Sequence, residues 1–116
     1  MLKTRLILDI PVADFPTPDI LKKMLRNCPD ILIVAEYEFD TRLQCGDLVN
    51  IKNFSFLYFP YDKQRQFSFE TFVKSRKYEI QMINESSSTY YIDIYLEIID
   101  KSVKEDIDSY LVNLFK

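Results

Sequence analysis

The segment Tyr90–Ile99 alternates strictly between aliphatic side chains and polar or aromatic ones. Successive side chains of a β-strand point to opposite faces, so this pattern predicts a strand with one buried face. The aliphatic set, which should face the core, is Ile92, Ile94, Leu96 and Ile98. The opposite set is Tyr91, Asp93, Tyr95 and Glu97. Because unpaired carboxylates are costly to bury, we expect this second face to be open to solvent.

The residues upstream predict a partner for this strand. Tyr78–Asn84 also alternates, and the polar run Asn84–Ser88 between the two segments is typical of a turn, so we expect an antiparallel hairpin. Aliphatic and then aromatic residues alternate with mostly polar ones between Val49 and Phe59 and predict further strand structure, whereas residues 63–77 fit either a strand or a short helix. The middle of the chain therefore predicts an antiparallel meander or a small barrel-like sheet.

The first part of the chain predicts a strand, a helix and a second strand. Leu2–Val12 alternates, and Ile31–Asp40 begins as the apolar run of a buried strand. Between them, Thr17 is a good N-cap for an amphipathic helix that Pro29 should end. This order is typical of a βαβ unit, in which the two strands are parallel.

A final amphipathic helix is predicted after the last strand. Ser102 and Glu105 have the spacing of a capping box. The apolar stripe that follows is Val103, Ile107, Tyr110, Leu111, Leu114 and Phe115. We therefore expect a single α+β domain over residues 1–116: an N-terminal βαβ unit followed by an antiparallel meander or small barrel-like sheet, closed by a C-terminal amphipathic helix.

Several classes of functional site need residues that this chain lacks. It has no histidine, which excludes Ser–His and Cys–His nucleophile pairs and histidine metal sites. Its one glycine, Gly46, cannot supply a phosphate-binding P-loop or a dinucleotide fingerprint. Cys28 and Cys45 cannot complete a structural zinc site alone, and we expect them to be reduced thiols in the cytoplasm. We therefore predict no catalytic residue, no metal and no cofactor.

Clustered carboxylates are the one signal for an enzyme. Glu36, Glu38 and Asp40 alternate along one predicted strand, and Asp93 and Glu97 share a face of another. Such groups can bind the Mg²⁺ or Mn²⁺ of a nuclease. Alternating acids are more often the solvated face of an amphipathic strand, so a metal-dependent nuclease-like enzyme is only the second alternative.

A basic and aromatic segment, residues 52–77, suggests a nucleic-acid-binding small β-barrel as the first alternative. Aromatic side chains on a sheet can stack on bases while cations hold phosphates. The candidate residues are Lys52, Phe54, Phe56, Tyr58, Lys63, Arg65, Lys74 and Arg76. The net charge of -3 disfavours this alternative, and aromatic residues that alternate in strands commonly form the core.

The leading hypothesis is a non-enzymatic protein-binding module: an adaptor, an inhibitor or immunity-type protein, or a small subunit of a larger assembly such as a virion. Its expected site is Tyr91, Asp93, Tyr95 and Glu97, in which tyrosines provide contact area and acids steer a partner with a basic patch. The sequence shows no signal peptide and no apolar run long enough to span a membrane, so we expect a cytoplasmic protein that does not bind membranes.

Overall fold

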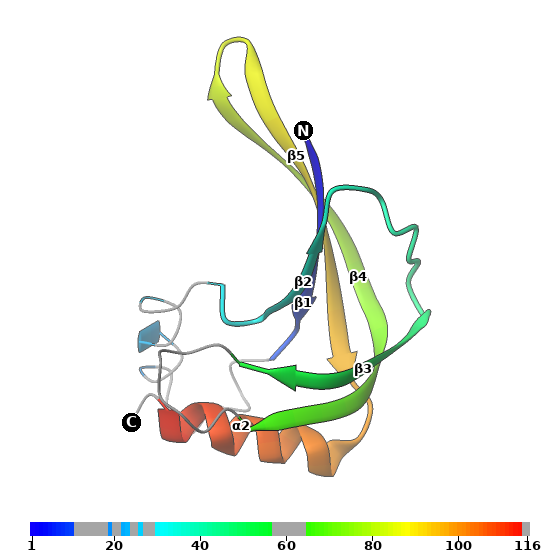
Figure 1. Cartoon of the computed structure of the whole chain (residues 1–116), viewed down its shortest axis with the longest axis vertical. Helices are drawn as coiled ribbons and strands as arrows, with labels where there is room; N and C mark the ends of the chain where they lie inside the picture. Colours follow the sequence, from blue (N-terminus) through cyan, green and yellow to red (C-terminus); the bar gives the residue numbers. More distant parts are fainter. Residues whose placement is uncertain (11–18, 20–21, 24–25, 27–29, 57–64, 115–116) are drawn as a thin grey trace.

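The computed structural model describes residues 1–10, 19, 22–23, 26, 30–56 and 65–114, and it is mostly a mixed five-stranded sheet with a C-terminal helix (Figure 1). Its elements are β1 (Leu2–Leu8), β2 (Ile33–Tyr37), β3 (Leu48–Ser55), β4 (Gln66–Asn84), β5 (Ser87–Ile98) and α2 (Lys101–Leu114). The strands are ordered β2-β1-β5-β4-β3, and within the described residues β2 and β3 do not pair, so the sheet is open rather than barrel-like.

The prediction of an N-terminal βαβ unit is wrong. β1 and β2 are antiparallel neighbours, with Thr4 opposite Tyr37 and Leu6 opposite Ala35, whereas a βαβ unit requires parallel strands. The parallel neighbour of β1 is instead β5. Alternation shows which segments are strands and which face they bury, but it does not show which strand each one pairs with. The helix predicted after Thr17 lies mostly outside the described residues.

The predicted antiparallel hairpin is confirmed and is longer than expected. β4 pairs with β5 from Thr71 opposite Ile98 to Asn84 opposite Ser87. The segment that fitted either a strand or a helix is strand from Gln66 onward. A register shift between Val73 and Ser75 interrupts β4, which therefore continues past a β-bulge rather than ending there.

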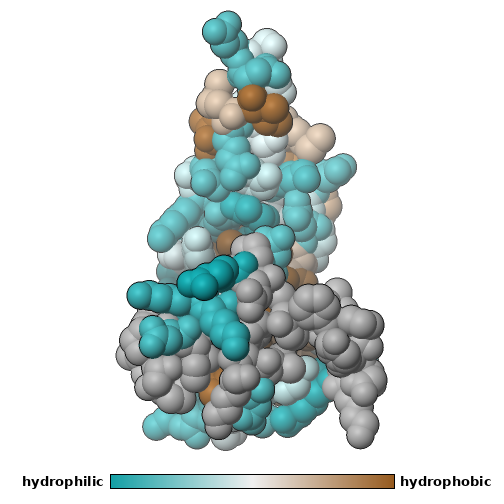
Figure 2. All heavy atoms as spheres, turned by 90° about the vertical axis from the view of Figure 1, so that its left-hand side faces the viewer, coloured by the Kyte–Doolittle hydropathy of each residue, from teal (hydrophilic) through white to brown (hydrophobic). Residues whose placement is uncertain are grey.

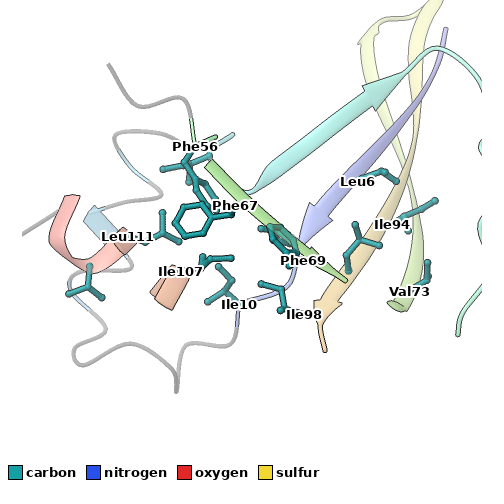
Figure 3. Close-up of a cluster of buried hydrophobic side chains, with 14 of the residues drawn as sticks. Leu6, Ile10, Phe56, Phe67, Phe69, Val73, Ile94, Ile98, Ile107 and Leu111 are labelled. Carbon is teal, nitrogen blue, oxygen red and sulfur yellow. The ribbon is translucent and has the colours of Figure 1, made fainter. Parts of the chain in front are cut away.

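α2 packs on one face of the sheet and closes the core. Ile107 and Leu111 are fully buried among side chains from β4 and β5 such as Phe69 and Ile98 (Figure 3). The helix begins two residues earlier than the capping box predicted, because Asp100 and not Ser102 is its N-cap. The Asp100 Oδ1 accepts a hydrogen bond of 2.9 Å from the Ser102 backbone N–H and one of 2.7 Å from the Ser102 hydroxyl.

The two faces of the sheet have different roles. The core face carries the aliphatic side chains of β5, which are buried as predicted: Ile92, Ile94, Leu96 and Ile98. The outer face carries Tyr91, Asp93, Tyr95 and Glu97. In Figure 1, α2 lies across only one end of the sheet, and the β4–β5 hairpin extends from the other end. Part of the core face therefore lies beyond the reach of the helix.

Candidate functional site

The β4–β5 hairpin projects beyond the rest of the sheet as an arm, residues 78–90 (Figure 1). β3 pairs with β4 only as far as Phe72, and β1 runs beside β5 only as far as Tyr90. Within the described residues, the part of the arm beyond Ile80 is thus a ribbon of two strands. Its turn is closed by Asn84, whose Oδ1 accepts hydrogen bonds from the backbone N–H and the hydroxyl of Ser86.

The arm presents an apolar surface, here called the arm face, made of Tyr78, Ile80, Met82 and Tyr90. Tyr78 stands opposite the buried Ile92 and Ile80 stands opposite Tyr90, so these side chains lie on the core face of the sheet. Their exposed fractions are 58% for Tyr78, 61% for Ile80, 67% for Met82 and 37% for Tyr90. The rings of Tyr78 and Tyr90 stack with their centroids 5.8 Å apart. Along β5 the apolar stripe of the core thus continues into the arm, where no other part of the described chain covers it.

None of the four residues of the arm face is charged, and the nearest charge is Arg76, which lies opposite Ile94 on the same face and donates a hydrogen bond to the Tyr78 hydroxyl. Glu79 stands opposite Tyr91 and the neutral Gln81 stands opposite Thr89, which places both on the outer face. Figure 2 shows apolar residues gathered below a hydrophilic tip of the arm. The arm is therefore amphipathic in the way of a half-buried hairpin, with the side that would be buried left open.

The arm also leaves one strand edge open. The backbone N–H of Tyr90 donates a 2.8 Å hydrogen bond to the Met1 carbonyl, so the Tyr90 backbone points toward β1 and away from β4. Its partner Ile80 therefore belongs to a non-hydrogen-bonded pair, and the N–H and C=O of Ile80 point to the opposite edge. By alternation, the backbone groups of Tyr78 and Met82 point the same way. Within the described residues, no third strand occupies this edge.

The outer face brings together the residues predicted to bind a partner, but Asp93 is not open there. It is only 7% exposed, and Arg5 of β1 donates two hydrogen bonds to it, from Nε to Oδ1 at 2.7 Å and from Nη2 to Oδ2 at 2.9 Å. The same Nη2 lies 3.1 Å from Glu79, and the guanidinium lies 4.0 Å from the centroid of the Tyr91 ring. The hydrogen bond to Asp93 raises the pKa of Arg5. The acid that was expected to steer a basic partner is neutralised within the chain.

The two remaining predicted residues are also engaged in contacts within the chain. Tyr95 is half-buried, its ring lies 5.0 Å from the Lys77 ammonium, and burial raises the pKa of its hydroxyl. Glu97 lies 4.0 Å from the ammonium of Lys74. An open groove of about 540 Å³ runs along this face and is lined by residues that include Arg5, Lys77, Asp93 and Tyr95. Opposite charges already alternate along the groove, so the outer face has little charge left to attract a basic partner.

The predicted nucleic-acid residues do not gather on one open face. Phe56 is 1% exposed and packs in the core against Phe54 and Phe67. The cations form ion pairs instead: Arg65 with Asp106, Lys74 with Asp9, and Arg76 with Asp40. Lys52 is exposed, whereas Tyr58 and Lys63 lie outside the described residues.

The acidic residues of the enzyme alternative are dispersed. Glu36 pairs with Lys3 at 3.3 Å, Asp40 pairs with Arg76 at 2.8 Å, and Asp93 pairs with Arg5. In the part of the chain that the structure describes, no three acidic or cysteine side chains are grouped so that they could hold a metal ion. Nor does any described helix have the length and apolar character to cross a membrane.

The alternation of Tyr78, Ile80 and Met82 predicts a strand of the hairpin but does not identify the arm face as a candidate site. Such a pattern does not show whether another segment covers the apolar side chains. The chain matches no protein-family model, no curated protein and no solved structure, so its function is inferred from its own geometry.

Proposed function

We propose that this chain is a non-enzymatic protein-binding module that docks on another protein chain through the arm face. The observation that carries the proposal is the break in exposure along a single apolar stripe. On β5 the side chain of Ile92 is 2% exposed, whereas across from it Tyr78 is 58% exposed, and Ile80 and Met82 further out are more exposed still. A strand face of this kind is stabilised when a second surface covers it.

The size and composition of the arm face suit a protein surface. Two tyrosines supply large contact areas with few rotatable bonds, and an isoleucine and a methionine fill the space between them. Covering Ile80 and Met82 would contribute roughly 1–2 kcal/mol each, because both are already partly buried in the free chain. The open edge beside these residues adds backbone donors and acceptors that a partner strand can use.

This proposal keeps the function expected from the sequence and moves the docking surface. The sequence favoured Tyr91, Asp93, Tyr95 and Glu97 on the outer face, where the structure shows carboxylates paired with Arg5 and Lys74. The arm face requires no basic patch on the partner, because it has no charged side chain. A partner with an apolar surface is therefore the better match.

The experiment compares the proteins that co-purify with the chain when the arm face is intact and when it is altered. A tagged copy would be expressed in the native source and purified, and the retained proteins, untagged copies of the chain included, would be quantified by mass spectrometry. The variant Ile80→Asp/Met82→Asp should lose a partner that the wild type keeps. Leu48→Asp is the matched control, because Leu48 is an exposed apolar residue of β3 outside the arm. Equal retention by all three proteins would overturn the proposal.

A further inference from the structure

The arm face can be covered by a copy of itself. A two-fold symmetric contact places the same patch on both partners, so the patch must be complementary to itself. A surface with charges of one sign would repel its own copy, but Tyr78, Ile80, Met82 and Tyr90 carry no charge. The charged residue nearest to them, Arg76, donates a hydrogen bond to the Tyr78 hydroxyl, and its charge is balanced by Asp40 at 2.8 Å. Lys77 and Glu79 lie toward the outer face and stay in solvent when two arm faces meet.

The exposed area is that of a weak pair of copies. The four residues of the arm face leave on the order of 450 Å² exposed per copy, or about 900 Å² for two, which is the size of a weak and transient interface. A single arm packed against a flat polar surface would cover less of this area.

The shape of the molecule allows this contact. The chain measures 43 × 30 × 28 Å, and the arm extends from the end of the sheet opposite α2 (Figure 1). Two arms can therefore lie face to face while the helix-bearing halves point away from each other. Sheets that pack in this way sit about 10 Å apart and interdigitate their inner side chains.

We infer that the occupant of the arm face is a second copy of this chain, held by arm-to-arm packing about a two-fold axis. This inference rests on the proposed function, because it names the partner of the same surface. It assigns the chain to the class of small subunits that form homo-oligomers. The interface is at the small end of its class, so the expected dimer is in exchange with the monomer at about 1–100 µM.

The inference is tested by molar mass as a function of concentration. Sedimentation equilibrium of the wild-type chain should give the mass of two copies at the highest concentration and of one copy after dilution. Ile80→Asp/Met82→Asp should stay monomeric at every concentration. Two controls should dimerise as the wild type does: Leu48→Asp, outside the arm, and Gln81→Asp, on the outer face of the arm itself.

A proximity measurement distinguishes arm-face packing from other contacts. In a background of Cys28→Ser and Cys45→Ser, Ile80→Cys should form an intermolecular disulfide readily, whereas Gln81→Cys on the opposite face should not. The variants at Leu48, Ile80, Gln81 and Met82 should each retain the circular dichroism spectrum and the urea midpoint of the parent chain into which they are introduced, since these side chains are exposed.

Two results would overturn the inference. One is a wild-type chain that remains monomeric at several times the highest concentration of the expected range. The other is a dimer that survives Ile80→Asp/Met82→Asp or that cross-links through Gln81→Cys as readily as through Ile80→Cys. The proposed function would still hold after either result if the wild type and Leu48→Asp retain a different protein that Ile80→Asp/Met82→Asp does not retain. It would fail as well only if nothing retained depends on the arm face.

Discussion

Arg5 and Asp93 form a two-point hydrogen-bonded ion pair across the parallel neighbours β1 and β5. Arg5 lies directly opposite Asp93 in the register, and both side chains are largely buried. Planar guanidinium and carboxylate groups match in this geometry, so the pair favours one register of the two strands over its alternatives. The outer face of β5 is thus part of the structural framework rather than a free acidic surface.

Removing one partner of this pair should be costly. Asp93→Ala leaves the Arg5 guanidinium without its main partner, and we expect the free energy of unfolding to fall by about 2–4 kcal/mol. Urea unfolding followed by circular dichroism measures this loss. Glu97→Ala should lower the free energy of unfolding by less than about 1 kcal/mol. Glu97 lies on the same face, but its ion pair with the more exposed Lys74 is long, at 4.0 Å. The double variant Arg5→Met/Asp93→Leu should recover most of the loss, and a double variant that is as unstable as Asp93→Ala would contradict this account.

The N-cap of α2 gives a second prediction. The Asp100 carboxylate accepts hydrogen bonds at the first turn, whereas the Ser102 hydroxyl donates its own hydrogen to Asp100. Asp100→Ala should therefore lower the urea midpoint more than Ser102→Ala does. Asp100→Asn should recover part of the loss, because asparagine is also a good N-cap. The opposite ranking would restore Ser102 as the cap.

Acid should destabilise the fold through two aspartates. The backbone N–H of Arg42 and the Arg76 guanidinium lower the pKa of Asp40, and hydrogen bonds from Ser102 and Val103 lower the pKa of Asp100. Both groups release their protons more easily in the folded chain. Their contribution to stability is therefore present above the ordinary aspartate pKa and is lost as pH falls through the lowered value.

The measurement is the urea midpoint between about pH 5 and pH 2, where this linkage acts. The midpoint of the wild type should fall steadily toward acid. Asp40→Asn should start lower at neutral pH and should fall less steeply, because one of the linked protonations is gone. Parallel curves for the two proteins would show that Asp40 does not contribute to the slope.

Packing of α2 on the sheet gives the fourth prediction. Leu111 is fully buried and faces the aromatic and aliphatic core (Figure 3). Leu111→Ala should lower the free energy of unfolding by about 2–5 kcal/mol, the range for a buried leucine that leaves a cavity. Ser109→Ala, at an exposed position of the same helix, should change it by less than about 0.5 kcal/mol. A near-zero loss for Leu111→Ala would mean that the helix does not pack as described.

The sequence was most informative where structure depends on local pattern. The faces of β5 and the antiparallel hairpin follow from alternation and turn residues within a short segment. The stripe of α2 follows from helical periodicity, and Ile107 and Leu111 are indeed buried. The cap was misplaced by two residues because Asp100 and Ser102 are both favourable N-cap types, and local preference does not separate them.

The sequence was least informative about long-range pairing and cover. Nothing in Leu2–Leu8 indicates that its parallel neighbour is β5 rather than the next strand of the chain. Nothing in the alternation of Tyr78, Ile80 and Met82 shows that α2 ends short of them. The ion pair of Asp93 was missed for the same reason, since its partner Arg5 is 88 positions away. Such features depend on where distant segments meet, which short-range patterns do not encode.

The parallel pairing of β1 and β5 has a kinetic consequence. Closing a connection of 88 residues costs conformational entropy that is recovered only when both strands are in place. β1 is synthesised long before its parallel partner β5. Before β5 is available, β1 can pair only with β2, and an isolated pair of strands is marginally stable in water. The central strands therefore cannot be joined until β5 leaves the ribosome. We expect the sheet to form late and as one cooperative unit, with refolding slow for a chain of this length.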